Sequence, residues 1–182
     1  MSLENIPHRP IFIDCEASSL SARSFPIEVA WGSELGKIES YLINPSDIKE
    51  WVDWSEDSQR IHGISLKQLF EDGVDPHWLC QRMNESLAGQ VLYSDVPRYD
   101  LRWIQALFTA CGQSMTFVVG DAIWLMIRLM SQDVLAAPDV FDEPLFDILE
   151  TTKKELGRQH RAAWDVEYLL HCWEKVNAAT AE

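Results

Sequence analysis

The sequence predicts one α/β domain. Apolar runs of strand length, such as 10–15 and 26–31, come early in the chain, and longer segments with apolar residues at helical spacing follow them. With 182 residues, 47% of them hydrophobic, the chain has the length of one domain and can bury a sizeable core. No linker, repeat or low-complexity stretch divides it. We therefore expect a single domain over 1–182, with about residues 1–8 and 177–182 frayed.

Three strands are expected in the first part of the chain. Residues 10–15 have the apolar character of a central strand, and 26–31 and 38–43 follow, with the turn-forming Gly36 between the last two. Consecutive strands with short connections favour a meander. The polar segment that holds Trp51 and Trp54 predicts no element of its own, although it could border a cleft.

Helices alternate with two short strands in the rest of the chain. Ser65 is a suitable helix cap, Pro97 is well placed to start a helix, and Gly112 to stop it. The expected helices are 65–70, 77–87, 97–111, 121–131, 144–156 and 161–176, and the expected strands are 91–93 and 116–119.

Charge and composition limit the classes of function. A net charge of -14 disfavours long-range capture of duplex nucleic acid, because phosphate binding usually needs clustered Lys and Arg. No run of about 18 apolar residues could span a bilayer, and the first residues lack a signal-peptide pattern, so we expect a cytoplasmic protein with no membrane contact. The four scattered cysteines suggest neither a zinc pair nor a disulfide framework. Basic residues gather around the later motifs, namely Arg98, Arg102, Lys153, Lys154, Arg158 and Arg161, where they bind phosphates or are solvated on helix faces.

Four acidic residues occupy positions that face the expected core. Asp14 and Glu16 end the first apolar run, and the two-residue period of a strand places both carboxylates on one face. Asp100 and Asp165 each share a helix face with apolar residues. A buried carboxylate needs a metal, a hydrogen bond or a cation. Either aspartate alone is most simply a satisfied acid or a cap, whereas all four together indicate a metal site.

His160 precedes Asp165 by five residues. Residues at that separation diverge by about 140° on a helix, so the two side chains converge only if His160 lies in a loop or a first turn. Gly157 can end the preceding helix after Leu156. A histidine in such a connection can approach a water molecule and accept its proton.

These motifs together resemble the DEDD superfamily of 3′–5′ exonucleases. Asp14-x-Glu16 resembles the first motif, Tyr99-Asp100-x-x-Trp103-Ile104 the second, and His160-x4-Asp165 the third. The third motif is similar to that of the histidine branch, which includes ribonuclease T, oligoribonuclease and proofreading exonuclease subunits. The tyrosine branch has its tyrosine where this chain has Arg161. The resemblance implies a ribonuclease H-like fold with a five-stranded mixed sheet flanked by helices.

The resemblance also implies a function. Asp14, Glu16, Asp100 and Asp165 would hold two Mg²⁺ or Mn²⁺ ions roughly 4 Å apart, and His160 would be the general base. Nucleoside 5′-monophosphates would be released from the free 3′ end of single-stranded or short RNA or DNA, with RNA slightly favoured. A homodimer is compatible with the resemblance, because many relatives pair. Two alternatives stay open: a catalytically idle nucleic-acid-binding or regulatory module on the same fold, and a hydrolase of small phosphodiesters.

Four further residues are expected at the substrate. Cys15 and Ala17 adjoin the first acidic motif, and Leu20 occupies the place where relatives often have a leucine against the terminal base. His62 lies in a His-Gly-Ile-Ser segment that resembles one common in the histidine branch. Leu20 and His62 each have an alternative role, which is packing or local structure.

Two other acids are not assigned to the site. Asp95 stands before Pro97, where it suits a helix cap. The Ser94-Asp95 pair replaces a His-Asn pair that is frequent in relatives, which could change how the scissile strand is held. Glu28 is flanked by apolar strand residues and is ambiguous.

Overall fold

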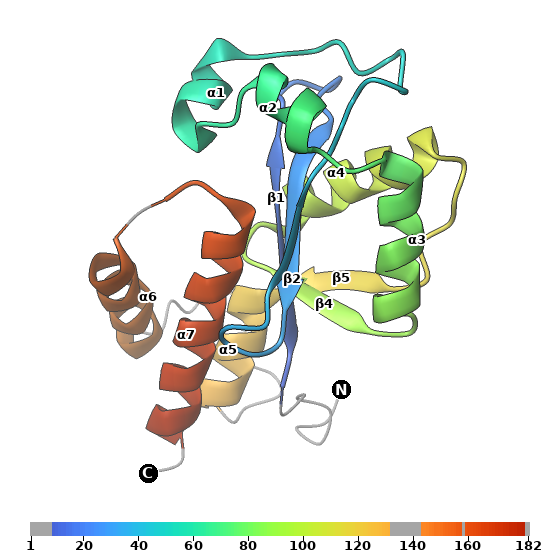
Figure 1. Ribbon diagram of the computed structural model, residues 1–182. Coiled ribbons are helices and arrows are strands. Elements are labelled where there is room, and N and C mark those ends of the chain that lie inside the picture. The colour runs from blue at the N-terminus through green and yellow to red at the C-terminus, as the bar shows by residue number, and fades with distance from the viewer. Residues whose placement is uncertain (1–8, 132–142, 158, 181–182) are drawn as a thin grey trace.

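A five-stranded mixed sheet forms the centre of the protein (Figure 1). The computed structural model describes residues 9–131, 143–157 and 159–180. The strand order is β3-β2-β1-β4-β5, with β2 antiparallel to both β1 and β3, and with β1, β4 and β5 parallel. The predicted meander and the five-stranded mixed sheet are therefore confirmed. The strands are β1 (Ile11–Ala17), β2 (Pro26–Gly32), β3 (Glu39–Leu42), β4 (Val91–Ser94) and β5 (Val118–Asp121).

Helices cover both faces of this sheet. In Figure 1, α3 and α4 lie on one side of the sheet, and α5, α6 and α7 lie on the other. Every predicted helix is present within a few residues of its expected bounds, and one additional helix, α1, was not predicted. The helices are α1 (Glu56–His62), α2 (Leu66–Asp72), α3 (Pro76–Leu87), α4 (Pro97–Ala110), α5 (Ala122–Ser131), α6 (Glu143–Leu156) and α7 (Ala162–Thr180).

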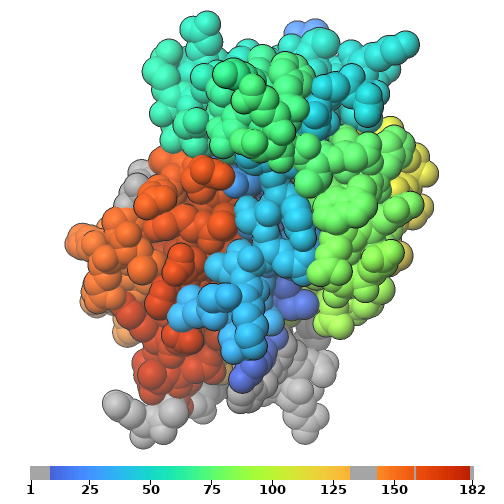
Figure 2. Space-filling view, viewed as in Figure 1, coloured from blue at the N-terminus to red at the C-terminus, as the bar shows by residue number. Residues whose placement is uncertain are grey.

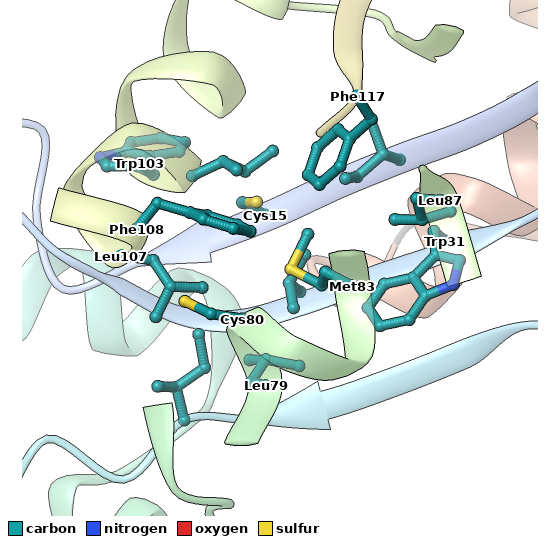
Figure 3. Packing of buried hydrophobic residues seen from close by; sticks show 14 of the residues in the cluster. Cys15, Trp31, Leu79, Cys80, Met83, Leu87, Trp103, Leu107, Phe108 and Phe117 are labelled. Carbon is teal, nitrogen blue, oxygen red and sulfur yellow. The ribbon is translucent and has the colours of Figure 1, made fainter. Parts of the chain in front are cut away.

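Side chains alternate along β1, so its apolar residues are divided between two hydrophobic cores, one on each face of the sheet. Ile13 and Cys15 pack against α3 and α4, in the cluster of Figure 3. Phe12 points to the opposite face and packs with residues of α5 and α7. Asp14 and Glu16 have the same parity as Phe12, so their side chains leave β1 on the face that α7 covers.

The segment with α1 and α2 covers one end of the body, seen at the top of Figure 2. Trp51 stacks on Phe25 with ring centroids 5.1 Å apart, and Trp54 packs on the same small cluster. These tryptophans attach the segment to the sheet and do not line the cavity described below. Ser65 caps α2 as predicted, since its side chain accepts the N–H of Gln68.

The ends of the chain fall partly outside the described residues. The sequence predicts frayed ends at about 1–8 and 177–182. Of these, 1–8 and 181–182 lie outside the described residues, and residues 177–180 form the last turn of α7. Among the helices that the structure describes, none is both long and apolar enough to cross a membrane.

Candidate metal centre

The candidate site lies where the carboxyl ends of β1 and β4 separate. The last β1 residue paired with β4 is Phe12, which lies opposite Tyr93, and β4 ends one residue later, at Ser94. The N–H of Cys15 instead donates to Oδ1 of Asp100 at 3.0 Å. An opening at the carboxyl ends of parallel strands is a usual place for a ligand in α/β folds.

Two groups of three carboxylates meet at this opening. Oxygen atoms of Asp14, Glu16 and Asp165 lie within 4.8 Å of one another, and the same is true of Asp14, Asp95 and Asp100. Asp14 belongs to both groups. The structure thus brings together the four acids that the sequence singled out, and it adds Asp95 as a fifth.

Two hydrogen bonds hold the Asp100 carboxylate in place. It lies in the first turn of α4, is 2% exposed, and accepts hydrogen bonds from the Cys15 N–H and the Ser94 hydroxyl. The Ser94 oxygen also accepts the N–H of Val96, at 3.0 Å. Although these donors favour the ionised form, burial outweighs them and raises the pKa of Asp100 to about 7.

Asp14 and Glu16 are also shifted towards their protonated forms. Burial, followed by the charges of Asp100 and Asp165, raises the pKa of Asp14 well above its ordinary value. Burial raises the pKa of Glu16 to about 8, and the nearby charges of Asp165 and Glu28 add to the effect. Carboxylates this close cannot all ionise unless cations compensate them, so the site has the electrostatics of a cation-binding centre.

The interpretation of Asp95 as the cap of α4 is wrong. The N-cap residue is Val96, which has no side-chain cap hydrogen bond. The Asp95 carboxylate instead lies near Asp14 and Asp100, where burial raises its pKa and the charge of Lys153 lowers it. The sequence signal that could have found it is its position directly after β4, at the same sheet end as the first motif.

His160 lies in the connection between α6 and α7, as the spacing predicts. Gly157 has a φ of 70° and follows the last residue of α6, so it ends that helix as expected. His160 and the five acids line one cavity of about 300 Å³, near the lower limit for small-ligand pockets. The same cavity is lined by Cys15, Val96, Tyr99, Trp103, Lys153, Trp164 and Tyr168.

The four residues expected at the substrate have different positions. Cys15 and Ala17 are buried in the core beneath α4, although Cys15 also borders the cavity and binds Asp100 through its backbone. Leu20 is 70% exposed on the loop between β1 and β2. His62 is 5% exposed and does not line the cavity.

His62 has a local structural contact. Its Nδ1 accepts the N–H of Ile64 at 3.0 Å, just after α1 ends at Gly63. Burial lowers the pKa of His62 to about 4, so the ring is neutral at neutral pH. This arrangement favours the alternative that His62 stabilises the turn between α1 and α2.

Part of the predicted basic cluster adjoins the cavity. Lys153 lines it directly. The guanidinium of Arg98 lies 4.8 Å from the ring centroid of Tyr99, and that of Arg102 lies 5.5 Å from the same centroid. Tyr99 in turn stacks on Trp103, with centroids 5.6 Å apart. A strip of cationic and aromatic groups therefore follows the start of α4 beside the cavity.

The fold is the ribonuclease H-like α/β fold found in exonucleases, as a comparison with solved structures shows. Several of the similar structures are of exonuclease I. E. coli exonuclease I in complex with a dA16 oligonucleotide is 15% identical with a TM-score of 0.66, and covers 93% of this chain and 41% of its own. Exonuclease I from Methylocaldum szegediense is 14% identical with a TM-score of 0.62, and covers 93% of this chain and 41% of its own.

A zinc-bound form of the E. coli exonuclease I complex with single-stranded DNA is also similar, at 14% identity and a TM-score of 0.63, covering 93% of this chain and 40% of its own. At these identities the likeness concerns the fold alone. This chain spans about two fifths of the length of the exonucleases it matches. No protein-family model and no curated protein matches the sequence.

Proposed function

We propose that this protein is a metal-dependent 3′–5′ exonuclease of the histidine branch, acting on single-stranded or short nucleic acid. The observation that carries the proposal is the convergence of five acids and one histidine on a single cavity at the carboxyl ends of β1 and β4. Structural metal sites are closed and fully coordinated, whereas this site opens to solvent beside a potential proton acceptor.

The residues present fit divalent cations. All of the candidate ligands are carboxylate oxygens, which suit hard ions such as Mg²⁺ and Mn²⁺. The two groups of acids share Asp14, which supports a pair of ions with one bridging ligand. When bound, such ions would activate a water molecule and stabilise the departing 3′-oxygen. Asp14, Glu16 and Asp165 would hold one ion, and Asp14, Asp95 and Asp100 the other.

His160 is the general base in this proposal. Its neutral imidazole accepts a proton from the water that attacks the terminal phosphodiester, and the product is a nucleoside 5′-monophosphate. The loop position before α7 places the ring at the cavity without the constraint of a helix face. Lys153, a cation in the same cavity, is suited to the charge of the scissile phosphate.

A single strand fits the surroundings of the cavity better than a duplex does. Aromatic faces bind unpaired bases, and Tyr99, Trp103, Trp164 and Tyr168 line the cavity. The exposed Leu20 stands on a braced loop, because Asp53 accepts hydrogen bonds from the hydroxyls of Ser19 and Ser21. Several of the matched E. coli exonuclease I structures are complexes with single-stranded DNA or with dA or dT oligonucleotides, so DNA deserves the same test as RNA.

A labelled single strand tests the proposal directly. A 5′-labelled oligonucleotide, as RNA and as DNA, is incubated with the protein while Mn²⁺ or Mg²⁺ is titrated. Metal-dependent shortening from the 3′ end, lost in Asp14→Asn and retained in the exposed control Asp47→Asn, supports the enzyme. Binding without cleavage would support the idle module instead. Cleavage of a small phosphodiester without shortening of oligonucleotides would support the second alternative.

A further inference from the structure

Glu28 is a buried carboxylate outside the metal centre. Every residue of β2 is buried, and the Glu28 side chain is only 2% exposed. In the antiparallel register its Cα pairs with that of Glu16 on β1, so two acids lie opposite each other on neighbouring strands. Like charges in this arrangement repel, and a buried carboxylate requires partners. The partners of Glu28 lie in the segment that joins His160 to α7.

Arg161 and the start of α7 supply these partners. Arg161 donates from Nε to both Glu28 carboxylate oxygens, at 3.2 and 3.0 Å, and from Nη2 to Oε1 at 2.7 Å. The N–H of Ala162, the first residue of α7, donates to Oε2 at 3.0 Å. Glu28 therefore binds a guanidinium through both of its oxygens and also satisfies a backbone donor that has no partner within the helix.

Arg161 is also tied to the helix through its backbone. Its carbonyl accepts the N–H of Trp164 at 2.8 Å and the N–H of Asp165 at 3.1 Å. The side chain of Arg161 is thus attached to the sheet, while its main chain closes the first turn that contains Asp165. His160 is the preceding residue, with a Cα only about 3.8 Å from that of Arg161.

We propose that Glu28 and Arg161 form a positioning clamp that sets His160 and Asp165 against the acids of β1. The proposal rests on the function proposed above. Neither clamp residue lines the cavity, so each acts through its neighbours and neither is a catalytic residue. Loss of the clamp would release the main chain directly after His160 and so widen the range of orientations of its ring.

The positive charge of Arg161 also affects the balance of charge beside the acids of β1. Glu28 lies opposite Glu16 on the neighbouring strand, and the guanidinium of Arg161 balances the negative charge of Glu28 there. A neutral residue in place of Glu28 would also avoid the repulsion, but it could not bind the guanidinium fork. The Glu28–Arg161 ion pair is therefore consistent with a positioning role. Avoiding a buried charge at this position would not by itself require such a pair.

Two conservative substitutions test the clamp. Glu28→Gln keeps the side-chain volume and an oxygen for the Ala162 N–H, and Arg161→Lys keeps the charge but loses the fork. The matched control is Glu39→Gln, because Glu39 binds both Nε and Nη2 of Arg82, at 2.9 and 2.7 Å, away from the cavity. Each variant is assayed below its thermal transition, which separates turnover from stability.

We expect Glu28→Gln and Arg161→Lys to lower kcat by about 10- to 100-fold, with KM changed by less than about threefold. Glu39→Gln should retain kcat. A kcat retained in both folded clamp variants, or an equal loss in the Glu39 control, would overturn the proposal. If Glu28→Gln does not fold, Arg161→Lys alone decides the outcome.

A spectroscopic measurement does not depend on the enzyme being active. The ring ¹H–¹³C signal of His160, assigned by comparison with His160→Gln, should move towards the position of an unstructured histidine in Arg161→Lys and remain unchanged in Glu39→Gln. An unchanged His160 signal in Arg161→Lys contradicts the clamp. If the wild-type protein does not shorten oligonucleotides, the proposed function fails, and this signal still decides whether Arg161 positions His160.

Discussion

Replacing Glu16 with glutamine should stabilise the metal-free protein, and the gain should grow as the pH rises. Burial raises the pKa of Glu16 from 4.5 to about 8 in the folded protein, with the charge of Asp165 as the next cause. The folded state therefore retains a proton that the unfolded chain releases above about pH 4.5. The stability that this proton contributes is fully present below that pH and is lost as the pH rises through about 8.

The expected size follows from the interval between the two pKa values. A rise from pH 5.5 to 8.5 crosses about 2.5 pH units of that interval, which lowers the free energy of unfolding by about 3.5 kcal/mol at about 1.4 kcal/mol per unit. Coupling of Glu16 to Asp14 and Asp165 divides this energy among several acids, so about 2 kcal/mol is a reasonable expectation for one substitution. For a domain of this size, that corresponds to a Tm difference of roughly 4–8 °C.

Thermal unfolding in a chelator measures this effect. The wild type and Glu16→Gln are melted at pH 5.5 and at pH 8.5, and Glu50→Gln, at an exposed position, removes one negative charge as the control. The Tm advantage of Glu16→Gln over Glu50→Gln should be larger at pH 8.5. Saturating Mn²⁺ should stabilise the wild type more than Glu16→Gln, since a bound ion compensates the carboxylate. An equal Tm advantage at both pH values would refute the reasoning.

Three further substitutions test individual residues of the site. His160→Ala should lower kcat by about 10²- to 10⁴-fold while calorimetric Mn²⁺ affinity persists, and near-normal nuclease activity would exclude a general base at this position. Asp95→Asn should weaken one of two Mn²⁺ binding steps by about tenfold relative to Asp47→Asn, and two unchanged steps would remove Asp95 from the ligands. Leu20→Ala should leave Tm within about 1 °C and raise KM for a single strand severalfold, since an exposed side chain contributes little to folding; an unchanged KM would assign Leu20 no substrate contact.

The main elements of the fold could be predicted because their patterns are local. The two-residue alternation of β1 placed Asp14 and Glu16 on one face, and helical periodicity placed Asp100 and Asp165 on core-facing stripes. The helix α1 has no such pattern, because its seven residues are mostly polar. Its only signals are the cap at Ser55 and the left-handed Gly63, and the structure shows both.

Asp95 shows where a local pattern misleads. An acid shortly before a proline usually caps the helix that the proline begins, and Asp95 stands two residues before Pro97. The direction of its carboxylate is instead set by the end of β4, which brings it beside Asp14 on a strand about 80 residues earlier in the chain. Only the three-dimensional arrangement of β1 and β4 makes that neighbour visible.

Glu28 and Arg161 show why the support of a site is harder to predict than its acids. They are separated by 133 positions, and each alone has an ordinary explanation, as a strand acid or a solvated cation. Their partnership nevertheless bears on chemistry, because ordering one loop residue costs about 1–2 kcal/mol of backbone entropy. His160 lies on such a loop. If the residue after it were not fixed, this backbone entropy would be lost each time the catalytic arrangement forms. The ion pair between β2 and the residue after His160 orders that residue when the protein folds, before any substrate is bound. The acids of β1 and their proposed base therefore form one preorganised unit.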